Sequence, residues 1–409
     1  MYEEKVRIAL FKPCSSNHKN FIYYFSTYNI LFLITLLGGI FWIGSVLALW
    51  MGLGRVARRT EESKPLNEWT PAGELPSISV LVAARNEEKN IRKLLEALQL
   101  QDYPKERWET IILDDSSSDN TVGIVHEYFD QRQRLQLIKV GIPPNGVAPK
   151  KNALIKGMSV AAGEIILVTD ADCVPGPGWV SGIARQFSAG IDAVVGYSPL
   201  SGDGVTGAVG KFDAFVNAVV SAGSIGLGHP TTAVGRNFSY RKTAWDAVGG
   251  FGSTLEGASG DDDLMLQRIA ANGGHIVFST DRSTVIRSNT KSTLGDWWRM
   301  KRRHLSAGKR YQPKLVLFSS ALYIFQIGLL ILAGLATFGK ISPIHVIAIW
   351  GFKVFADWLT LHRGARLLHH RNWIGAFLTG EVISPILFAV LVPISLVGKV
   401  RWKGRALNN

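Results

Sequence analysis

The sequence predicts an α/β domain with a mostly parallel sheet, joined to all-α transmembrane segments. Between about residues 77 and 290, short β-branched runs alternate with stretches of helical periodicity. Continuous apolar strands between helices are typical of a parallel sheet that is covered on both faces. Four long apolar runs flank this region, and 47% of the 409 residues are hydrophobic against 19% charged. That balance indicates a chain lying partly in a membrane.

Composition narrows the class of protein further. The two cysteines, Cys14 and Cys173, are too few for a disulfide framework and favour a reducing compartment. The net charge of +13 would also suit nucleic-acid binding. Basic residues, however, follow the first apolar run and close the chain, and we predict a membrane partner and no nucleic acid.

The first apolar run predicts a transmembrane anchor over residues 30–51, preceded by an N-terminal tail of residues 1–29. Residues 30–50 carry no charge, and a helix of roughly 20 residues crosses the hydrocarbon core. The run is too long for a signal-peptide core. Arg55, Arg58 and Arg59 follow it directly, which places the following domain in the cytoplasm. We expect an integral protein of a bacterial-type plasma (inner) membrane; a buried core helix is the less favoured alternative.

The middle region, residues 77–290, reads as alternating strands and helices. Apolar runs predict strands, and amphipathic periodicity predicts the helices between them. The expected order is strand 78–83, helix 89–100, strand 110–113, helix 121–129, strand 135–140, helix 152–162 and strand 165–168. Gly204, Gly207 and Gly210 match neither a P-loop nor a dinucleotide fingerprint, and we interpret them as a flexible loop.

Acidic residues follow two of these strands. Asp114 and Asp115 come directly after one, and Asp170 and Asp172 come after another. Parallel strands place their carboxyl ends at one edge of the sheet, where ligands bind. Carboxylates there suit a hard divalent cation whose shell a phosphorylated substrate completes. Aspartates also cap helices and form turns, which is the alternative interpretation.

The C-terminal part predicts an interfacial amphipathic helix over residues 291–312 and about three transmembrane segments over residues 313–398. Trp297 and Trp298 among basic neighbours suit a helix lying in the headgroup layer. The apolar runs are 315–338, 341–361 and 376–397.

Charges and prolines complicate the last two runs. Lys353 and Asp357 are four residues apart on one helical face and suggest an ion pair, or else a role in an acceptor channel. Pro385 and Pro393 leave open whether the last run spans or forms a re-entrant hairpin. Three spans would send the basic tail, residues 399–409, outside, whereas basic residues prefer the cytoplasm.

Six segments, in order, resemble the membrane-bound family-2 glycosyltransferases of GT-A fold, which include cellulose, chitin and hyaluronan synthases and ceramide glucosyltransferase. The segments are ISVLVAARNEEKNI, TIILDDSSSDNT, PKKNALIKG, GEIILVTDADCVPGPGW, GRNFSYRKTAW and SGDDDLMLQRI. The similarity runs over residues 77–311. One segment alone is weak support, but six in the family's order are strong, and the GT-A domain is Rossmann-like with a mostly parallel sheet.

The resemblance implies a nucleoside diphosphate sugar donor, most simply a UDP-sugar. Ala83 and Glu87 would border the nucleoside, and Asp115, with Asp114 beside it, would bind the base. Lys150 would meet base or phosphate, with Lys151 as its neighbouring substitute. Asp172 would ligate Mg²⁺ or Mn²⁺, and Asp170 would hold ribose or metal-bound water. A cation there would stabilise the leaving diphosphate.

The resemblance also implies inversion, which needs a general base near the acceptor hydroxyl. The family places this base in a Glu-Asp pair before an apolar helix. Alignment on Leu264 makes Asp261 the base, with Gly260 where Glu is common, and a shift of one residue makes it Asp262. In the GRNFSYRKTAW segment, Gly235 and Asn237 would lie on the acceptor side.

The family's Gln-x-x-Arg-Trp segment is altered in this chain. If Arg303 takes the place of the arginine, His304 replaces the tryptophan; if Arg302 does, Arg303 replaces it. Either arginine would hold the donor diphosphate, and His304 would face the acceptor. In the polymer synthases the missing tryptophan stacks on the acceptor sugar, so its absence argues against processive polymerisation.

Together these features predict an inverting glycosyltransferase (hexosyl- or N-acetylhexosaminyltransferase) acting on a lipid or a membrane-associated glycan. One alternative is a processive polysaccharide synthase. Another is a catalytically inert membrane scaffold of the same fold, which the retained carboxylate clusters disfavour because idle clustered charges repel.

Overall fold

The computed structural model describes residues 17–62, 75–129, 134–187, 190–257, 259–371, 373–397, 400–402 and 405–407. Most of the predicted N-terminal tail, including Cys14, lies outside the described residues, as do Lys399 and Lys403 of the basic tail. The first helix begins at Asn17, so the described end of the predicted tail is helical.

The chain forms twelve helices within its described part. They are α1 Asn17–Glu62, α2 Ile91–Gln99, α3 Thr121–His126, α4 Pro149–Val160, α5 Trp179–Gln186, α6 Gly204–Gly226, α7 Lys242–Ala247, α8 Asp263–Ala271, α9 Leu294–Ser306, α10 Pro313–Thr337, α11 Pro343–Leu367 and α12 Trp373–Leu396. The strands are β1 Ile78–Ala84, β2 Trp108–Asp114, β3 Leu135–Lys139, β4 Ile165–Asp170, β5 Cys173–Pro175, β6 Ala193–Gly196, β7 Leu200–Ser201, β8 Phe238–Arg241, β9 Ile276–Ser279, β10 Ile286–Asn289, β11 Val400–Trp402 and β12 Arg405–Leu407.

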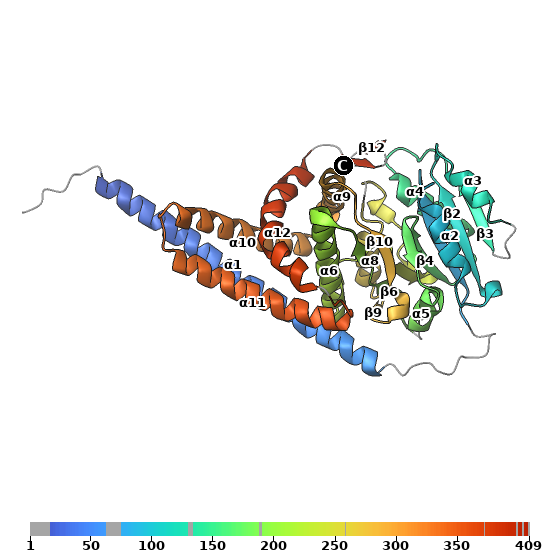
Figure 1. Ribbon diagram of the computed structural model, residues 1–409, viewed down its shortest axis with the longest axis horizontal. Coiled ribbons are helices and arrows are strands. Elements are labelled where there is room, and N and C mark those ends of the chain that lie inside the picture. The colour runs from blue at the N-terminus through green and yellow to red at the C-terminus, as the bar shows by residue number, and fades with distance from the viewer. Residues whose placement is uncertain are drawn as a thin grey trace, which may run out of the picture.

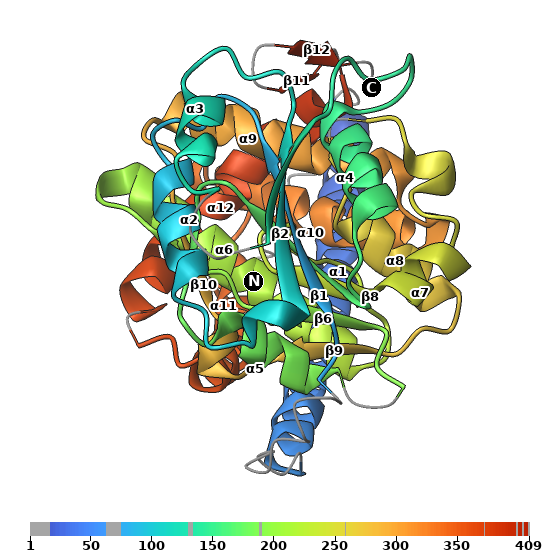
Figure 2. The same cartoon turned by 90° about the vertical axis from the view of Figure 1, so that its right-hand side faces the viewer.

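The main sheet has seven strands in the order β3-β2-β1-β4-β8-β6-β9. Strands β3, β2, β1 and β4 are parallel, and only β8 runs antiparallel to its neighbours. Side chains alternate between two cores: Val80 and Val82 belong to the cluster that includes α2, α3 and α5, and Leu81 to the cluster that includes α4, α6 and α8. Figure 2 shows α2 and α3 on one side of the strands and α4 on the other. The predicted α/β fold with a mostly parallel sheet is confirmed.

The interpretation of the glycine motif as a flexible loop is wrong. Gly204, Gly207 and Gly210 form the first turns of α6, not a flexible loop. A Cβ at Gly207 would lie 2.4 Å from the backbone of Gly202, and one at Gly210 would lie 2.7 Å from Thr290. Close approach of neighbouring chain therefore explains these glycines. The low intrinsic helix propensity of glycine had concealed the helix.

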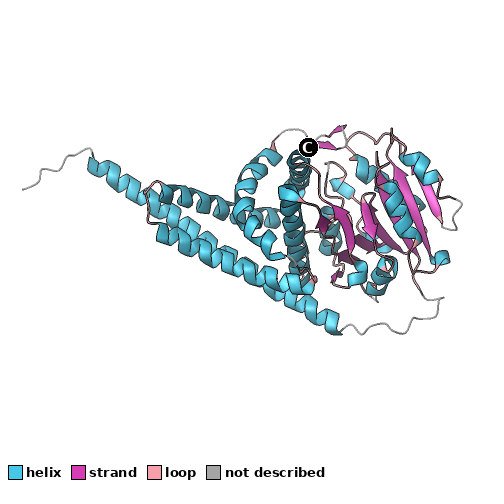
Figure 3. Cartoon of the chain, viewed as in Figure 1, coloured by secondary structure: helices cyan, strands magenta, loops and turns pink. Residues whose placement is uncertain are grey.

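Four helices, α1, α10, α11 and α12, are long and apolar enough to cross a membrane. Of these, α1, α10 and α11 run together and project away from the strands (Figures 1 and 3). Their packing is close, since a Cβ at Gly38 of α1 would lie 3.0 Å from Phe325 of α10. Many of their remaining apolar side chains are exposed, as expected for helices surrounded by lipid.

Helix α12 takes a different course. It is one continuous helix that contains both Pro385 and Pro393, and so it is not a re-entrant hairpin. In Figure 1 it lies crosswise to α1, α10 and α11, beside α6 and α9. Its contacts reach the domain at both ends: Gly380 packs on Phe212 of α6, and Arg302 of α9 donates to the carbonyl of Val397 at 2.7 Å.

A buried charge cluster ties the membrane helices together. The Nζ atom of Lys353 lies 2.7 Å from Asp357 and 2.5 Å from Glu381 of α12. The indole N–H of Trp42 on α1 donates to Asp357 at 2.8 Å. The predicted Lys353–Asp357 pair is therefore confirmed, and Glu381 and Trp42 complete it. Buried charges are tolerated when they are paired in this way.

Candidate active site

Two loops at the carboxyl edge of the sheet brace each other. Asn86 and Ser116 adopt positive φ angles of 53° and 56°, and the Asn86 side chain accepts from the backbone N–H of Ser118 at 2.8 Å. Asp115 is almost fully buried and lies 3.9 Å from Arg85. Strained, cross-linked loops of this kind are common at ligand sites.

The residues predicted to bind the nucleoside lie on these two loops and at the ends of the strands that precede them. Glu87 accepts from Asn90 at 2.7 Å, and Asp114 accepts from the backbone N–H of Ser117 at 3.2 Å. Ala83 is half-buried near the end of β1 and pairs in register with Asp170 of β4. The structure therefore brings Ala83, Glu87, Asp114 and Asp115 to the sheet edge that β4 also reaches.

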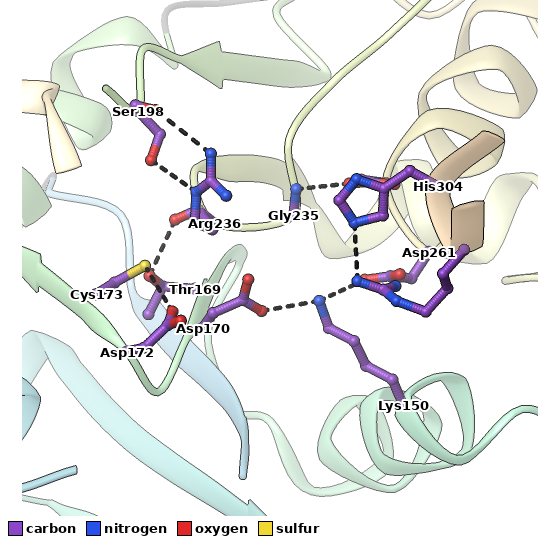
Figure 4. A network of polar contacts seen from close by, with 12 residues as sticks. Lys150, Thr169, Asp170, Asp172, Cys173, Ser198, Gly235, Arg236, Asp261 and His304 are labelled. Atoms are coloured by element: carbon purple, nitrogen blue, oxygen red, sulfur yellow. Dashed lines mark hydrogen bonds and ion pairs between the residues drawn. The ribbon is translucent and has the colours of Figure 1, made fainter. Parts of the chain in front are cut away.

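Lys150 joins two parts of the site. Its Nζ atom lies 2.9 Å from Asp170, at the end of β4, and 2.8 Å from Asp261, before α8 (Figure 4). Burial alone would lower the pKa of Lys150, but Asp170, Asp261 and Asp262 outweigh it and raise the pKa. Burial would likewise raise the pKa of Asp170, yet Lys150 and two arginines lower it to about 2. Both groups are therefore charged at neutral pH.

Lys151 points elsewhere. It is 1% exposed and donates to the carbonyls of Thr254 and Glu256. Burial lowers its pKa to about 8. Successive helix positions are about 100° apart, so only one of the two lysines can face the sheet edge, and Lys150 is that residue.

The three consecutive aspartates have different surroundings. Asp261 is buried and faces Lys150. Asp262 caps α8 through the N–H of Asp263 and also accepts from the N–H of Gly235 at 2.7 Å. Asp263 accepts from Thr232 and Ala233, and from the hydroxyl of Tyr311 at 2.6 Å. Of the three, Asp261 alone faces a side chain that also contacts the donor-side Asp170.

Asp262 has the pKa of a general base but not the free oxygen that a base needs. Burial, followed by repulsion from Asp263 and Asp261, raises its pKa to about 7, a value that suits a general base. Each oxygen of Asp262 nevertheless already accepts a backbone N–H. Geometry therefore favours Asp261, because a base needs an oxygen that can turn towards the acceptor.

Glycines shape this region. A Cβ at Gly235 would lie 3.1 Å from the Nζ of Lys150 and 3.2 Å from Asp261, so a side chain there would press on the ion pair. Gly260 has a φ of +87° and faces Leu264 closely. The left-handed conformation explains why glycine stands at Gly260, where glutamate is common in the resembled family.

Asn237, in contrast, does not reach the site. It is 0% exposed, and its amide bonds to Tyr197, Thr284 and Trp179 within the core. Arg302, which was expected to bind the donor, instead donates to the carbonyl of Val397, directly after α12. Arg303 and His304 face the site, with Arg303 donating to the Nε2 of His304 at 2.8 Å. Burial and then the neighbouring cations hold the pKa of His304 well below its usual range.

Asp170 and Asp172 could supply only some of the ligands of a metal ion. Asp172 lies 3.5 Å from Lys291, and each aspartate thus has a lysine nearby. Within the described residues, no group of three or more His, Cys, Asp or Glu side chains could hold an ion. Two carboxylates at one edge fit a hard cation whose other ligands come from a bound diphosphate.

One cavity of about 470 Å³ contains most of these groups. The predicted residues that line it are Lys150, Asp170, Asp172, Gly235, Asp261, Asp262, Arg303 and His304. The sequence interpretation missed Arg236, Lys291, Trp297 and Tyr311, which also line it. Arg236, Lys291 and Tyr311 lie in loops whose sequence carried no pattern typical of a site, although Arg236 belongs to the GRNFSYRKTAW segment. Trp297 lies within α9 and was interpreted only as a residue of the membrane surface.

Comparison with protein families agrees with this geometry. The glycosyl transferase family 2 model matches residues 79–243, and the glycosyl transferase family group 2 model matches residues 165–397. The second match alone covers more than half of the chain. The chain is a family-2 glycosyltransferase. The predicted resemblance to the family-2 glycosyltransferases is thereby confirmed.

Known relatives of this family-2 glycosyltransferase cover parts of it. It is 28% identical over 287 residues to a probable glycosyltransferase, YdaM, of Bacillus subtilis, covering 67% of this chain and 65% of the relative. It is 40% identical over 100 residues to a beta-monoglucosyldiacylglycerol synthase of Trichormus variabilis, which covers 24% of this chain and 21% of that relative. The matched region thus spans less than two thirds of either relative.

A solved structure supports the fold. The mannosyltransferase PcManGT of Pyrobaculum calidifontis, in complex with GDP-Man and Mn²⁺, superimposes with a TM-score of 0.56 at 18% identity. The match covers 83% of this chain and 99% of that one. At this identity the likeness concerns the fold of the family-2 glycosyltransferase.

Proposed function

We propose that the enzyme transfers a sugar, with inversion, from a UDP-sugar to a hydroxyl of a lipid or membrane-associated glycan. The observation that carries this proposal is the position of Lys150 between Asp170 and Asp261 in one cavity. Asp170 ends the strand that borders the donor loops, and Asp261 precedes α8 on the opposite side of the lysine. Donor-side and acceptor-side carboxylates are thus held a few ångströms apart.

In this proposal Asp261 acts as the general base. Its carboxylate takes the proton of the acceptor hydroxyl as the oxygen attacks the anomeric carbon. Lys150 and Arg303 would hold and neutralise the diphosphate, and Asp262 and Asp263 would fix the start of α8. Asp172 and Asp170 would hold Mg²⁺ or Mn²⁺, which supplies charge stabilisation for the leaving diphosphate.

The donor loops would bind the nucleoside. Asp115 and Asp114 would recognise the base, and Glu87 and the backbone at Ala83 would border the ribose and base. Support comes from the bracing of these loops, which holds four candidate residues at one edge. Pre-organised loops bind a ligand with less loss of conformational entropy.

The processive alternative is less well supported. If Arg303 aligns with the family's arginine, His304 stands where the acceptor-stacking tryptophan is expected, and its Nε2 already accepts from Arg303. We therefore propose single transfer. The inert-scaffold alternative is set aside because the chain is a family-2 glycosyltransferase whose carboxylates converge on one cavity.

Release of UDP from purified protein tests the proposed reaction. Incubation with a panel of UDP-sugars, each supplied with Mn²⁺ and membrane extract, is expected to give UDP with one or a few of them. GDP-sugars serve as the matched control for recognition of the donor's nucleobase. UDP release from none of the donors, or equal turnover of GDP-sugars, would contradict the proposed donor class.

We also propose that the catalytic domain is cytoplasmic and that α12 lies at the membrane surface. Arg55, Arg58 and Arg59 end α1 on the side of the domain, which is the side that basic residues prefer. With α1, α10 and α11 as three spans and α12 crosswise, the chain ends on the same side as the domain. This arrangement removes the conflict with the basic tail.

Reporter fusions test this topology. Green fluorescent protein at the C-terminus is expected to fluoresce, and alkaline phosphatase at the same place is expected to be inactive, because both report a cytoplasmic end. Phosphatase inserted at Gly339, between α10 and α11, is expected to be active. An active phosphatase at the C-terminus would show instead that α12 crosses the bilayer.

A further inference from the structure

The cavity has a second end that the proposed reaction does not use. Beyond the carboxylates it is lined by one face of α10 and one face of α12. The residues are Val316, Ser319, Ser320 and Tyr323 on α10, and Val392, Ser395 and Leu396 on α12. Both sets follow the i, i+3, i+4 spacing of a single helical face, so the cavity continues between two helices of the apolar part.

This end of the cavity is apolar in character. The hydroxyls of Ser319 and Ser395 donate to carbonyls of their own helices, at 2.7 Å to Leu315 and 2.7 Å to Val392. They therefore present little polarity to the cavity. Val316, Val392 and Leu396 add only hydrocarbon. A water-soluble sugar chain would gain little from such walls, whereas an acyl or other hydrocarbon chain would gain from burial.

The helices also close this end. Tyr323 of α10 donates to the carbonyl of Ala389 of α12 at 3.0 Å. Among the described lining residues, Tyr323 is the farthest along α10 from its start at Pro313. From Val316 to Tyr323 is roughly 10 Å at the rise of an α-helix. A polymer channel would have to continue beyond this contact, whereas a lipid needs only an opening to one side.

The same cavity contains an indole whose N–H is unpaired within the described part of the chain. Trp297 of α9 lines the cavity and is 2% exposed. Its N–H has no hydrogen-bond partner among the described residues. An unpaired buried donor costs free energy unless a ligand satisfies it. A polar head group beside Trp297 in the cavity would accept that hydrogen bond.

We propose that the acceptor is a membrane lipid with a hydroxyl-bearing head group, which enters sideways from the bilayer between α10 and α12. Its hydrocarbon lies along Val316, Ser320 and Val392, its head group meets Trp297, and its hydroxyl reaches Asp261. This inference rests on the proposed function. The hydroxyl oxygen bonds to the anomeric carbon, the bond from that carbon to the diphosphate breaks, UDP leaves with the electron pair, and Asp261 takes the proton.

A bulky residue in the opening tests the route. In membrane vesicles containing native lipids and labelled UDP-sugar, wild-type protein is expected to label the chloroform-soluble fraction. Ser320→Trp is expected to lower this labelling at least about tenfold, since a small displacement of a reacting group already has large effects on rate. UDP affinity is expected to stay within about twofold, because Ser320 lies on α10, whereas the donor loops follow β1 and β2.

Leu317→Trp is the matched control. Leu317 lies on the same helix, is 75% exposed and does not line the cavity, so labelling is expected to stay near the wild-type level. Ser320→Cys in a Cys14→Ser background separates blockage from misfolding, because a bulky thiol reagent is added after activity is established. Cys173 is buried and offers the reagent little access.

The outcomes distinguish the two proposals. Equal lipid labelling by wild type, Ser320→Trp and the blocked Ser320→Cys protein would overturn the route. Label only in water-soluble glycan, with UDP released, would overturn the lipid acceptor but leave the sugar transfer standing. Neither label nor UDP from any donor in wild-type protein would overturn the proposed function itself.

Discussion

Asp261→Asn is expected to slow sugar transfer by about 10²–10⁴-fold, the usual contribution of a general base. Asparagine keeps the shape of the side chain but cannot take the acceptor proton. UDP affinity is expected to change little, because Lys150 keeps its contact with Asp170 at 2.9 Å. Turnover with saturating donor and UDP binding by calorimetry, both on the same preparation, would measure the two effects.

Asp262→Asn is the matched control for this experiment. Asn is nearly as good an N-cap as Asp, so α8 is expected to keep its start. The single carbonyl oxygen of Asn cannot also accept from the N–H of Gly235, so that contact is lost. We expect a loss of only a few-fold. A large loss in Asp262→Asn alone would move the base by one residue, consistent with the raised pKa of that carboxyl. If both variants lost UDP binding in step with rate, the cluster would not supply the base.

Asp172→Asn is expected to lower turnover by about 100-fold or more while the protein still folds and inserts. Metal stabilisation of developing charge contributes several kcal/mol, and each 1.4 kcal/mol is a factor of about ten in rate. Asp170 and Asp172 line one cavity, and the described residues contain no group of three or more His, Cys, Asp or Glu side chains that could hold an ion. Losing one of these two carboxylates should therefore sharply weaken the binding of Mg²⁺ or Mn²⁺. Turnover titrated with Mn²⁺ would show the loss.

Asp203→Asn is a suitable control, because Asp203 is an exposed aspartate before α6 that does not line the cavity. Its turnover and its response to Mn²⁺ are expected to match wild type. Thermal unfolding of both variants in detergent would separate loss of metal from loss of fold. Full activity in EDTA, or in Asp172→Asn, would rule out the metal role.

The local pattern of the sequence was sufficient for the first half of the domain, from β1 to β4 with α2, α3 and α4. Runs such as 78–83 and 165–168 are apolar on both faces because helices cover both sides of the sheet. Their carboxyl ends share an edge by the rule for parallel strands, and the sequence could therefore place Asp115 and Asp170 at one site. The apolar runs identified, by length alone, the four helices that are long and apolar enough to cross a membrane.

Tertiary packing decided what periodicity could not. Lys150 and Lys151 are equivalent in the sequence, and only the position of α4 against the sheet selects Lys150. Residues 150, 170 and 261 are far apart in the chain and meet because the sheet topology brings β4 and α8 together. Asn237 and Arg302 carried plausible motifs, yet their hydrogen bonds to core and α12 keep them from the cavity.

Helix α12 shows the physical reason most clearly. Hydropathy reports how apolar a segment is but not which way it runs, and α12 is as apolar as the helices beside it. Its direction follows from contacts with α6 and α9, in which Phe212 meets Gly380 and Arg302 meets Val397. Those contacts join residues more than 90 positions apart. The sequence by itself determined that α12 is apolar and long enough to cross a membrane, and only packing against the domain determined its crosswise course.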